Sequence, residues 1–293
     1  PVSAHAAGGI GVDIVRVRQL AERLQARARP PLPADLIPLQ IAGSRVGDVQ
    51  PEVARFVADR IGGFVLKHGV LTIADNTLDF DARTALLQEA AHALHAASFI
   101  TGWRDENLYV GTPPVAAVER AACRSLGITT EAVHLNAYSD ASTLLVARRA
   151  AHKQIDPGLW DNLVGGMVPA GESLHQALAR EALEEAGLQI DRVELQRGRW
   201  FQMRRPVPEG LQSEIIHVYD ASLPDGVSLQ NQDGEVDAIE RRTLDEVLNA
   251  IENDEFTLES ALVTLESVTR RAVIDTVAEF FRFDYETSSI HAI

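Results

Sequence analysis

The chain has 293 residues, with 27 lysine and arginine against 42 aspartate and glutamate, which gives a formal net charge of −15. A chain this acidic has no general attraction for nucleic acid or for an anionic membrane, so we expect neither as a partner. Any anionic substrate must be met by a local basic cluster together with a metal ion. Because Cys123 is the only cysteine, an internal disulfide and a cysteine-based zinc site are excluded, which suits a reducing, cytoplasmic compartment.

The first half of the chain mixes helical and strand patterns. Residues 1–12 are small and glycine-rich and should form a loose end, and we find neither a signal peptide nor 18 uninterrupted apolar residues. Apolar spacing, prolines and glycines predict helices at 15–28, 51–61, 81–100 and 116–125 and short strands at 39–49 and 64–73. We therefore expect residues 1–130 to form a small α+β domain.

The second half is richer in strands and begins without a Gly/Ser-rich linker, so the two halves should pack against each other. Alternating apolar residues predict strands at 133–138, 143–148, 193–194, 198–203 and 214–220, and helices follow at 243–251 and within 259–281. Strands followed by helices indicate an α/β layered domain over 131–285, with a weakly ordered tail at 286–293.

Within this half, residues 166–188 carry an acidic helix. Glu181, Glu184 and Glu185 follow directly on Arg180, and at helical spacing they share an arc of roughly 100°. Like charges on one face raise one another's pKa, and a hard divalent cation such as Mg²⁺ resolves that conflict. An ordinary solvated acidic helix is the alternative. The opposite side is expected to pack inward and holds Ala179, Leu183 and Ala186.

The spacing of the fixed residues is more specific than their charge. Gly166 is followed after five residues by Glu172 and after seven more by the Arg180 segment, which ends at Gly187-Leu188. This pattern resembles the Nudix box, Gx5Ex7REUxEExGU, where U is aliphatic and Ala182 occupies the first U position. An ordinary surface helix would need neither Glu172 nor the glycines at 166 and 187. The resemblance implies a Nudix α/β/α sandwich with a mixed sheet, preceded by the α+β domain.

The resemblance also implies site roles. It implies that Glu184 and Glu185 bind Mg²⁺ or Mn²⁺ close to Gly166, with Glu181 as a further ligand or as the base that accepts a proton from water. Arg180 can hold the glutamates in place through its forked guanidinium. The reaction implied is attack by a metal-activated water on a diphosphate phosphorus.

Candidate residues also lie outside the box. Nudix enzymes often take another carboxylate from a later loop, and Glu235 is our candidate, with Asp233 second; a solvated turn is the alternative. The cations before the box, Arg148, Arg149 and Lys153, can offset phosphate charge, or else protect an edge strand from pairing.

Four further side chains have open interpretations. Trp103 can stack on a heteroaromatic ring or pack in a core. His134 and Asn136 alternate on one strand face and are candidate substrate contacts, although a lone histidine is usually structural. Trp160 is expected in the core rather than as a substrate platform.

A wider similarity covers residues 36–250. The segments that carry it are IAGSRVGDVQPEV, GWRDENLY, ERAACRSLGI, VHLNAY, RRAAHKQIDPGLWDNLVGG, IIHVYDASLP and NQDGEVD. Together they resemble a Nudix subfamily with its own N-terminal domain, which in some fungi is fused to thiamine pyrophosphokinase. The resemblance implies hydrolysis of thiamine diphosphate, and preferentially of its oxidised derivatives, to the monophosphate and phosphate.

We therefore predict Mg²⁺-dependent hydrolysis of a small organic diphosphate, most favourably of thiamine type, with a homodimer as an open option. One rival is a Nudix pyrophosphatase acting on a nucleoside diphosphate derivative such as ADP-ribose. A second is an isopentenyl-diphosphate isomerase-like enzyme, because R-x4-K-x3-PG-x-WDN also occurs there, although its GGH is GGM here. A third is a non-catalytic ligand-sensing module, which usually has a decayed box.

Overall fold

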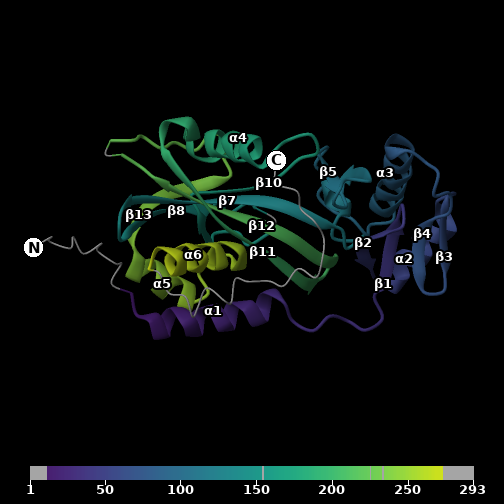
Figure 1. Cartoon of the computed structure of the whole chain (residues 1–293), viewed down its shortest axis with the longest axis horizontal. Coiled ribbons are helices and arrows are strands. Elements are labelled where there is room, and N and C mark those ends of the chain that lie inside the picture. Colours follow the sequence, from purple (N-terminus) through teal and green to yellow (C-terminus); the bar gives the residue numbers. More distant parts are fainter. Residues whose placement is uncertain (1–11, 154, 225, 233, 273–293) are drawn as a thin grey trace, which may run out of the picture.

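The computed structural model describes residues 12–153, 155–224, 226–232 and 234–272. The chain forms two lobes that lie side by side (Figure 1). The N-terminal lobe contains β1 (Ile37–Ile41), β2 (Ser44–Val49), α2 (Pro51–Arg60), β3 (Phe64–Lys67), β4 (Val70–Ile73), α3 (Phe80–Ala96), β5 (Asn107–Val110), β6 (Ala116–Glu119) and the 3₁₀ turn η1 (Arg120–Ala122). The C-terminal lobe contains α1 (Ile14–Ala28), β7 (Thr129–Asp140), β8 (Thr143–Arg149), β9 (Trp160–Asn162), β10 (Val164–Met167), α4 (Leu174–Ala186), η2 (Ile190–Arg192), β11 (Glu194–Val207), β12 (Gly210–Ser222), β13 (Val236–Thr243), α5 (Leu244–Glu252) and α6 (Leu258–Arg271).

The N-terminal lobe is built on a four-stranded sheet in the order β2-β1-β4-β3. Its β1 and β4 are parallel, whereas the outer pairs are antiparallel. Helices α2 and α3 bury apolar residues such as Val57 and Leu87 in one core with Leu39 and Leu71 of the sheet. A separate two-stranded ribbon, β5 with β6, packs against α3 and leads into the second lobe.

One predicted helix of this lobe is wrong. Residues 116–119 form strand β6, paired with β5, and only the short turn η1 follows at 120–122. Alanine favours helix, but the four residues of β6 are all buried, and tertiary pairing overrides a weak local preference. The change has a local consequence at Glu119. Its buried carboxylate accepts hydrogen bonds from the backbone N–H groups of Arg104, Glu106 and Ala121.

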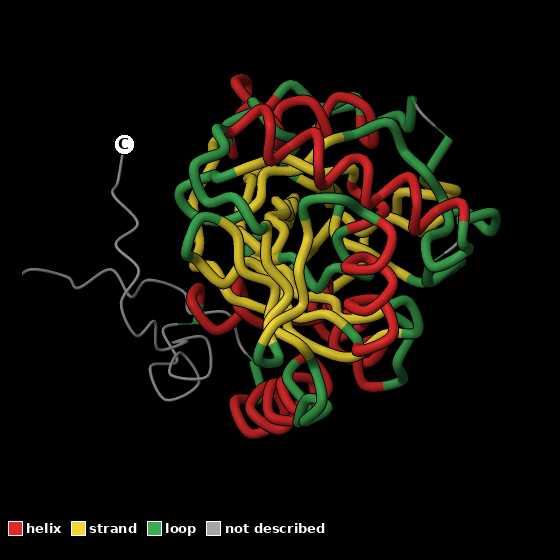
Figure 2. The backbone as a smooth tube through the Cα atoms, turned by 90° about the vertical axis from the view of Figure 1, so that its right-hand side faces the viewer, coloured by secondary structure: helices red, strands yellow, loops and turns green. Residues whose placement is uncertain are grey.

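The C-terminal lobe is a sandwich around a seven-stranded sheet. The main order is β11-β12-β7-β8-β13, with β10 paired to β7 and β9 to β8, and only β12 with β7 is parallel. Helix α4 covers one face, while α5, α6 and α1 lie on the other (Figure 1). In the end-on view the strands run through the middle with helices around them (Figure 2). The predicted α/β/α sandwich with a mixed sheet is therefore confirmed.

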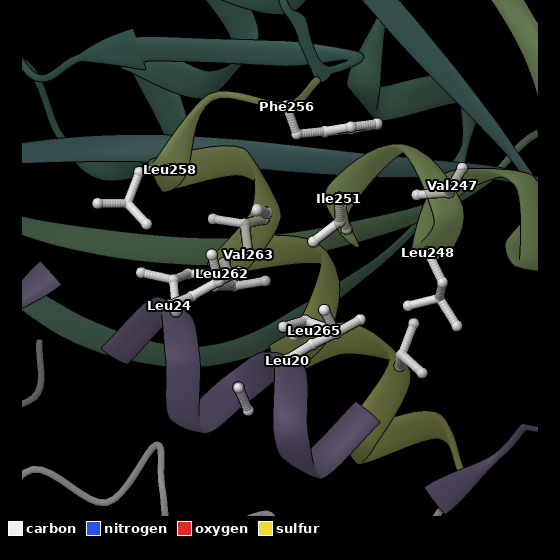
Figure 3. Close-up of a cluster of buried hydrophobic side chains, with 14 of the residues drawn as sticks. Leu20, Leu24, Val247, Leu248, Ile251, Phe256, Leu258, Leu262, Val263 and Leu265 are labelled. Atoms are coloured by element: carbon white, nitrogen blue, oxygen red, sulfur yellow. The ribbon is translucent and has the colours of Figure 1, made fainter. Parts of the chain in front are cut away.

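Helix α1 belongs in space to the C-terminal lobe, although it precedes the other lobe in sequence. Leu20 and Leu24 are 4% and 2% exposed and belong to the core cluster that contains Leu262 and Leu265 of α6 (Figure 3). Asp13 caps the helix by accepting from the backbone N–H groups of residues 15 and 16. The chain therefore leaves this lobe after α1, builds the N-terminal lobe, and returns at β7.

The two lobes contact each other directly, as the missing linker predicts. Backbone hydrogen bonds cross between them: Leu211 N–H donates to the Arg124 carbonyl at 2.9 Å, and Ala170 N–H donates to the Asn107 carbonyl at 2.7 Å. Within the described ranges no helix is long and apolar enough to cross a membrane. The predicted loose end at 1–12 falls, except for its last residue, outside the described residues, as do the tail at 286–293 and the end of the predicted 259–281 helices.

Candidate functional site

Strand β10, the loop after it and helix α4 carry the box. Ser173 caps α4 and forms a capping box with Gln176, so the first turn of the helix has partners for its free N–H groups. Gly187 ends the helix with φ 64°, a left-handed conformation that glycine adopts at little cost. The helix therefore begins and ends where the motif spacing requires.

The buried side of α4 matches the predicted one in part: Ala186 is buried and Ala179 is partly buried in the same core, but Leu183 is not. Leu183 is 45% exposed, whereas Ala177, Leu178, Ala182 and Ala186 are buried against the sheet. These buried positions are adjacent on the helix to Glu181 and Glu185, so both carboxylates lie beside the packed side rather than opposite it. Leu183 misled because an apolar side chain favours burial, whereas Leu178 and Ala182 lie on the side of the helix that meets the sheet.

Arg180 holds three of the box carboxylates with one guanidinium. Its Nε donates to Glu172 at 3.1 Å, and its Nη1 donates to Glu181 at 2.9 Å and to Glu184 at 3.2 Å. Burial alone would lower the pKa of Arg180, but its hydrogen bond to Glu172 and the charge of Glu181 raise it. Arg180 is therefore charged throughout the physiological range and fixes the glutamates relative to the loop.

Two of the carboxylates, Glu181 and Glu185, contact the two glycines of β10. A Cβ atom on Gly166 would lie 2.0 Å from Cδ of Glu181, so only glycine leaves room for that side chain. The backbone N–H of Gly165 donates to Glu185 at 2.9 Å. Burial raises the pKa of Glu181 against the opposing charge of Arg180, and it raises that of Glu185 well above the usual range.

These carboxylates are chemically suited to a hard divalent cation. They offer oxygen ligands, and a cation would relieve the cost of holding partly buried like charges together. Within the described ranges, no three acidic, histidine or cysteine side chains are already gathered around one metal position. Glu181 and Glu184 face Arg180 instead, so metal binding requires them to share or leave that contact.

Glu235 lies beside Glu185. Both side chains line a small recess together with Arg149, Lys153 and Asp161. Lys153 donates to Glu235, and although burial opposes it, this contact lowers the pKa of the carboxyl. The sequence therefore identified two long-range neighbours, Lys153 and Glu235, of the box glutamates. The second candidate, Asp233, lies outside the described residues.

The paired arginines diverge. Arg149 lines the recess and donates to Asp161 at 2.9 Å. Arg148 is exposed, donates to the Gly158 carbonyl at 3.3 Å and lies over the Trp160 ring. Successive side chains of a strand point to opposite faces, which separates the pair. Trp160 itself is 6% exposed and packs in the core, as predicted.

Three predicted substrate contacts occupy different surroundings. His134 lines the cleft described next and accepts or donates at Nδ1 to Asn162 at 3.0 Å. Asn136 is 1% exposed, and its amide is bonded to Asp220 and Asn162. Trp103 stacks on His92 with ring centroids 4.5 Å apart, at the edge of the N-terminal core. Asn136 and Trp103 thus have structural partners, whereas His134 also reaches the site.

A cleft runs from the box toward the N-terminal lobe. Beside Gly165 and Gly166 it measures about 140 Å³ and is lined by Asp161 as well as His134 and Arg149. It continues into a cavity of about 270 Å³, with which it shares residues from both lobes, namely Arg120, Arg124, Ile155, Met167, Gln212 and Glu214. Sequence reasoning missed Arg120, Arg124 and Glu214, because no local spacing connects them to the box.

Comparison with protein families divides the chain. A model described as the NUDIX domain matches residues 128–261, and one described as DUF4743, a domain of unknown function, matches residues 19–130. A solved protein of Deinococcus radiodurans is 22% identical, covers 48% of this chain and 82% of its own, and has a TM-score of 0.39.

Curated relatives span several kingdoms. An uncharacterized protein of Saccharomyces cerevisiae is 28% identical over 67% of this chain, which spans 64% of that protein's length. Nudix hydrolase 24 of Arabidopsis thaliana is 27% identical over 82% of this chain and 69% of its own. An isopentenyl-diphosphate Delta-isomerase of Mycolicibacterium vanbaalenii is 33% identical over 29% of this chain and 45% of its own. The chain therefore carries a Nudix domain at residues 128–261 behind a DUF4743 domain at residues 19–130, and Nudix hydrolases are among its relatives.

Proposed function

We propose that the chain hydrolyses a diphosphate bond in a small organic diphosphate and requires Mg²⁺ or Mn²⁺. The observation that carries this proposal is the box geometry: the Arg180 guanidinium gathers Glu172 of the entry loop with Glu181 and Glu184 of the capped helix, and Glu181 lies against Gly166. A decayed, ligand-sensing module would have no need for this intact set. A bound divalent cation supplies a lowered water pKa and positive charge at the phosphoryl oxygens.

The residues of this chain would divide the work. Glu184, Glu185 and Glu181 would hold the cation with the Gly166 backbone, and Glu235 stands beside Glu185 as a further carboxylate. Burial raises the pKa of Glu181 above that of an ordinary glutamate, which favours it as the proton acceptor, and proton transfer to a positioned carboxylate is typically worth about 10²–10⁴-fold. Lys153 and Arg149 line the same recess and would offset the charge of the phosphates.

For the substrate we propose thiamine diphosphate or its oxidised derivatives. Support comes from the ordered segments over residues 36–250 that resemble the thiamine-type Nudix subfamily. These segments include GWRDENLY in the N-terminal lobe and NQDGEVD, whose Glu235 accepts from Lys153. The second candidate is allylic isomerisation. It is favoured by the local similarity to an isopentenyl-diphosphate Delta-isomerase and by the motif R-x4-K-x3-PG-x-WDN, which spans Arg148–Asn162.

The test is phosphate release by the purified full chain with Mg²⁺ and after chelation. The substrates are thiamine diphosphate, its oxo and oxy derivatives, ADP-ribose, 8-oxo-dGTP and isopentenyl diphosphate. We expect the highest kcat/KM on a thiamine-type substrate and a loss on the order of 10²-fold or more in Glu184→Gln and in Glu185→Gln. Glu194→Gln, an exposed strand position, is the matched control.

Three results would distinguish these assignments. Undiminished turnover in both box variants would remove the assigned roles of the glutamates. A best substrate that is a nucleotide would retain the hydrolase and replace the thiamine assignment, and formation of an isomer without phosphate release would favour the second candidate.

A further inference from the structure

Glu214 is a buried carboxylate without a protein partner. It lies on β12, is 5% exposed, and lines both the cleft at the box and the adjoining 270 Å³ cavity. Among the described residues, no hydrogen bond or ion pair reaches its carboxylate. Burying such a group without a partner costs free energy, so a side chain of this kind on a cavity wall points to a ligand that completes it.

The opposite wall of this cavity comes from the N-terminal lobe. It presents Arg104, Arg120 and Arg124. Glu119 fixes the backbone of the Arg104 loop by accepting from its N–H at 2.9 Å, and Glu106 pairs with Arg120 at 2.8 Å. The wall is therefore held by partly buried contacts within its own lobe.

The spacing between the two walls is also fixed. The Arg124 carbonyl accepts from Leu211 N–H at 2.9 Å, and a Cβ on the adjacent Gly210 would lie 2.3 Å from that same oxygen. Glu214 follows on the same strand. The lobes are thus in backbone contact at the edge of the cavity, which lies between them.

A larger cavity between the lobes is a weaker candidate. It measures about 490 Å³ but shares only Leu108 with the smaller one and does not include Gly165 or Gly166. Both of its carboxylates already have partners: Glu131 is 41% exposed and pairs with His217 at 3.0 Å, and Glu172 pairs with Arg180 at 3.1 Å. Within the described part of the chain, the smaller cavity is the one that joins an unpaired buried carboxylate to the box.

We propose that the DUF4743 lobe completes the substrate pocket and that Glu214 is its specificity-determining residue, which accepts a hydrogen bond from an N–H group on the organic part of the substrate. This inference rests on the proposed function for the position of the diphosphate at the box. The chemical class is then an organic diphosphate with an amino-bearing nitrogen ring. The cavity and the cleft together approach the size of small-ligand sites.

The electrostatics of the site agree with this role. Burial and the nearby charge of Glu259 raise the pKa of Glu214 to about 7, against the opposing charges of Arg124, Arg120 and Arg205. An N–H donor from a ligand would favour the charged form and replace the water that burial removes.

The experiment compares Glu214→Leu, which removes the acceptor, with Glu214→Gln, which keeps one amide oxygen and the shape. Calorimetric titration of the full chain measures the Kd of thiamine diphosphate and ADP-ribose, which carry amino groups, and of isopentenyl diphosphate, which carries none. We expect Glu214→Leu to weaken an amino-bearing probe by roughly 10- to 100-fold and Glu214→Gln to weaken it less. Isopentenyl diphosphate should bind both variants as it binds the parent chain.

Glu194→Leu is the control for the glutamate, and Arg104→Ala with its exposed control Arg192→Ala tests the N-terminal wall. Arg104→Ala should weaken the same probe, whereas Arg192→Ala should not. An unchanged Kd in Glu214→Leu, equal losses for all probes, or no binding of either amino-bearing probe would overturn the inference. Binding and hydrolysis are separate measurements, so the two proposals can fail separately. Loss of binding confined to the amino-bearing probes would support the pocket even if no diphosphate were hydrolysed. Normal hydrolysis with an unchanged Kd in Glu214→Leu would overturn the pocket and leave the proposed function standing.

Discussion

Gly166 shows how tightly a single residue of the box is constrained. Its missing Cβ leaves the space that the Glu181 side chain occupies, with Cδ 2.0 Å from the position a methyl group would take. The atoms that would collide belong to the flexible end of a side chain, so the backbone could stay in place while the carboxylate moved. The glycine of the motif therefore serves the position of Glu181 rather than a turn.

We predict that Gly166→Ala retains the fold but lowers kcat by on the order of tenfold or more, because Glu181 is displaced from the other carboxylates. The melting temperature and the rate of phosphate release are measured together. Gly62→Ala is the control, since nothing lies within 4 Å of its added methyl group. A Gly166→Ala enzyme with full kcat would show that the position of Glu181 is unimportant.

Glu214 gives a pH prediction with a defined sign. Its folded pKa is about 7 against a usual value of 4.5, so the folded chain binds the proton more tightly than the unfolded chain. The protonated Glu214 carboxyl therefore adds to the free energy of unfolding. This contribution is fully present below pH 4.5 and is lost as the pH rises through about 7, by at most ~3 kcal/mol.

Urea unfolding at pH 5 and at pH 8 measures this effect. The free energy of unfolding of the parent chain should fall between the two pH values by more than that of Glu214→Gln, which cannot ionise. The two chains differ only at residue 214. The difference between their changes in free energy of unfolding therefore reports this one group and not the other titrating residues. Parallel pH dependences would contradict a raised pKa at Glu214.

At the scale of elements, periodicity predicted most helices and strands correctly, but it failed at one position of α4 and at β6. In α4, Leu183 is exposed and Ala182 is buried, because the position of a residue around the helix, and not hydrophobicity alone, decides which side chain meets the sheet. In β6, pairing with β5 overrode the helical preference of alanine. Both errors concern tertiary neighbours, which a local pattern does not contain.

The packing of helix α1 against the C-terminal lobe can be tested by its effect on stability. Leu20 is 4% exposed and packs in the core of the C-terminal lobe (Figure 3), whereas Val15 on the same helix is 64% exposed. We predict that Leu20→Ala lowers the free energy of unfolding by about 2–4 kcal/mol and that Val15→Ala changes it little. Urea unfolding followed by tryptophan fluorescence, to which Trp160 in the same core contributes, is the measurement. Equal effects of the two substitutions would show that α1 is not part of this core.

At the scale of the molecule, the box was predictable and the pocket was not. Arg180 and its glutamates lie within one helix and its entry loop, so spacing alone predicted their contact. Lys153 and Glu235 were named as candidates, but their pairing depends on the sheet. Glu214 and the arginines of the N-terminal lobe meet only because two lobes dock, and no sequence period encodes that distance. If Glu214 selects the substrate as we propose, docking of the lobes is the feature on which substrate choice depends.

Gly210 tests this dependence directly. Its φ is +143°, and an added Cβ would lie 2.3 Å from the Arg124 carbonyl oxygen, a backbone atom that cannot turn aside. We predict that Gly210→Ala separates the lobes at the cavity and raises KM by on the order of tenfold while kcat changes less, because the box remains assembled.

Gly43→Ala is the matched control: φ is +79° there and nothing lies within 4 Å, so it carries backbone strain without a collision. Kinetics on the best substrate and the melting temperatures of both variants distinguish misdocking from general destabilisation. If Gly210→Ala lost stability but kept its KM, the DUF4743 lobe would support the fold of the Nudix domain without forming its pocket.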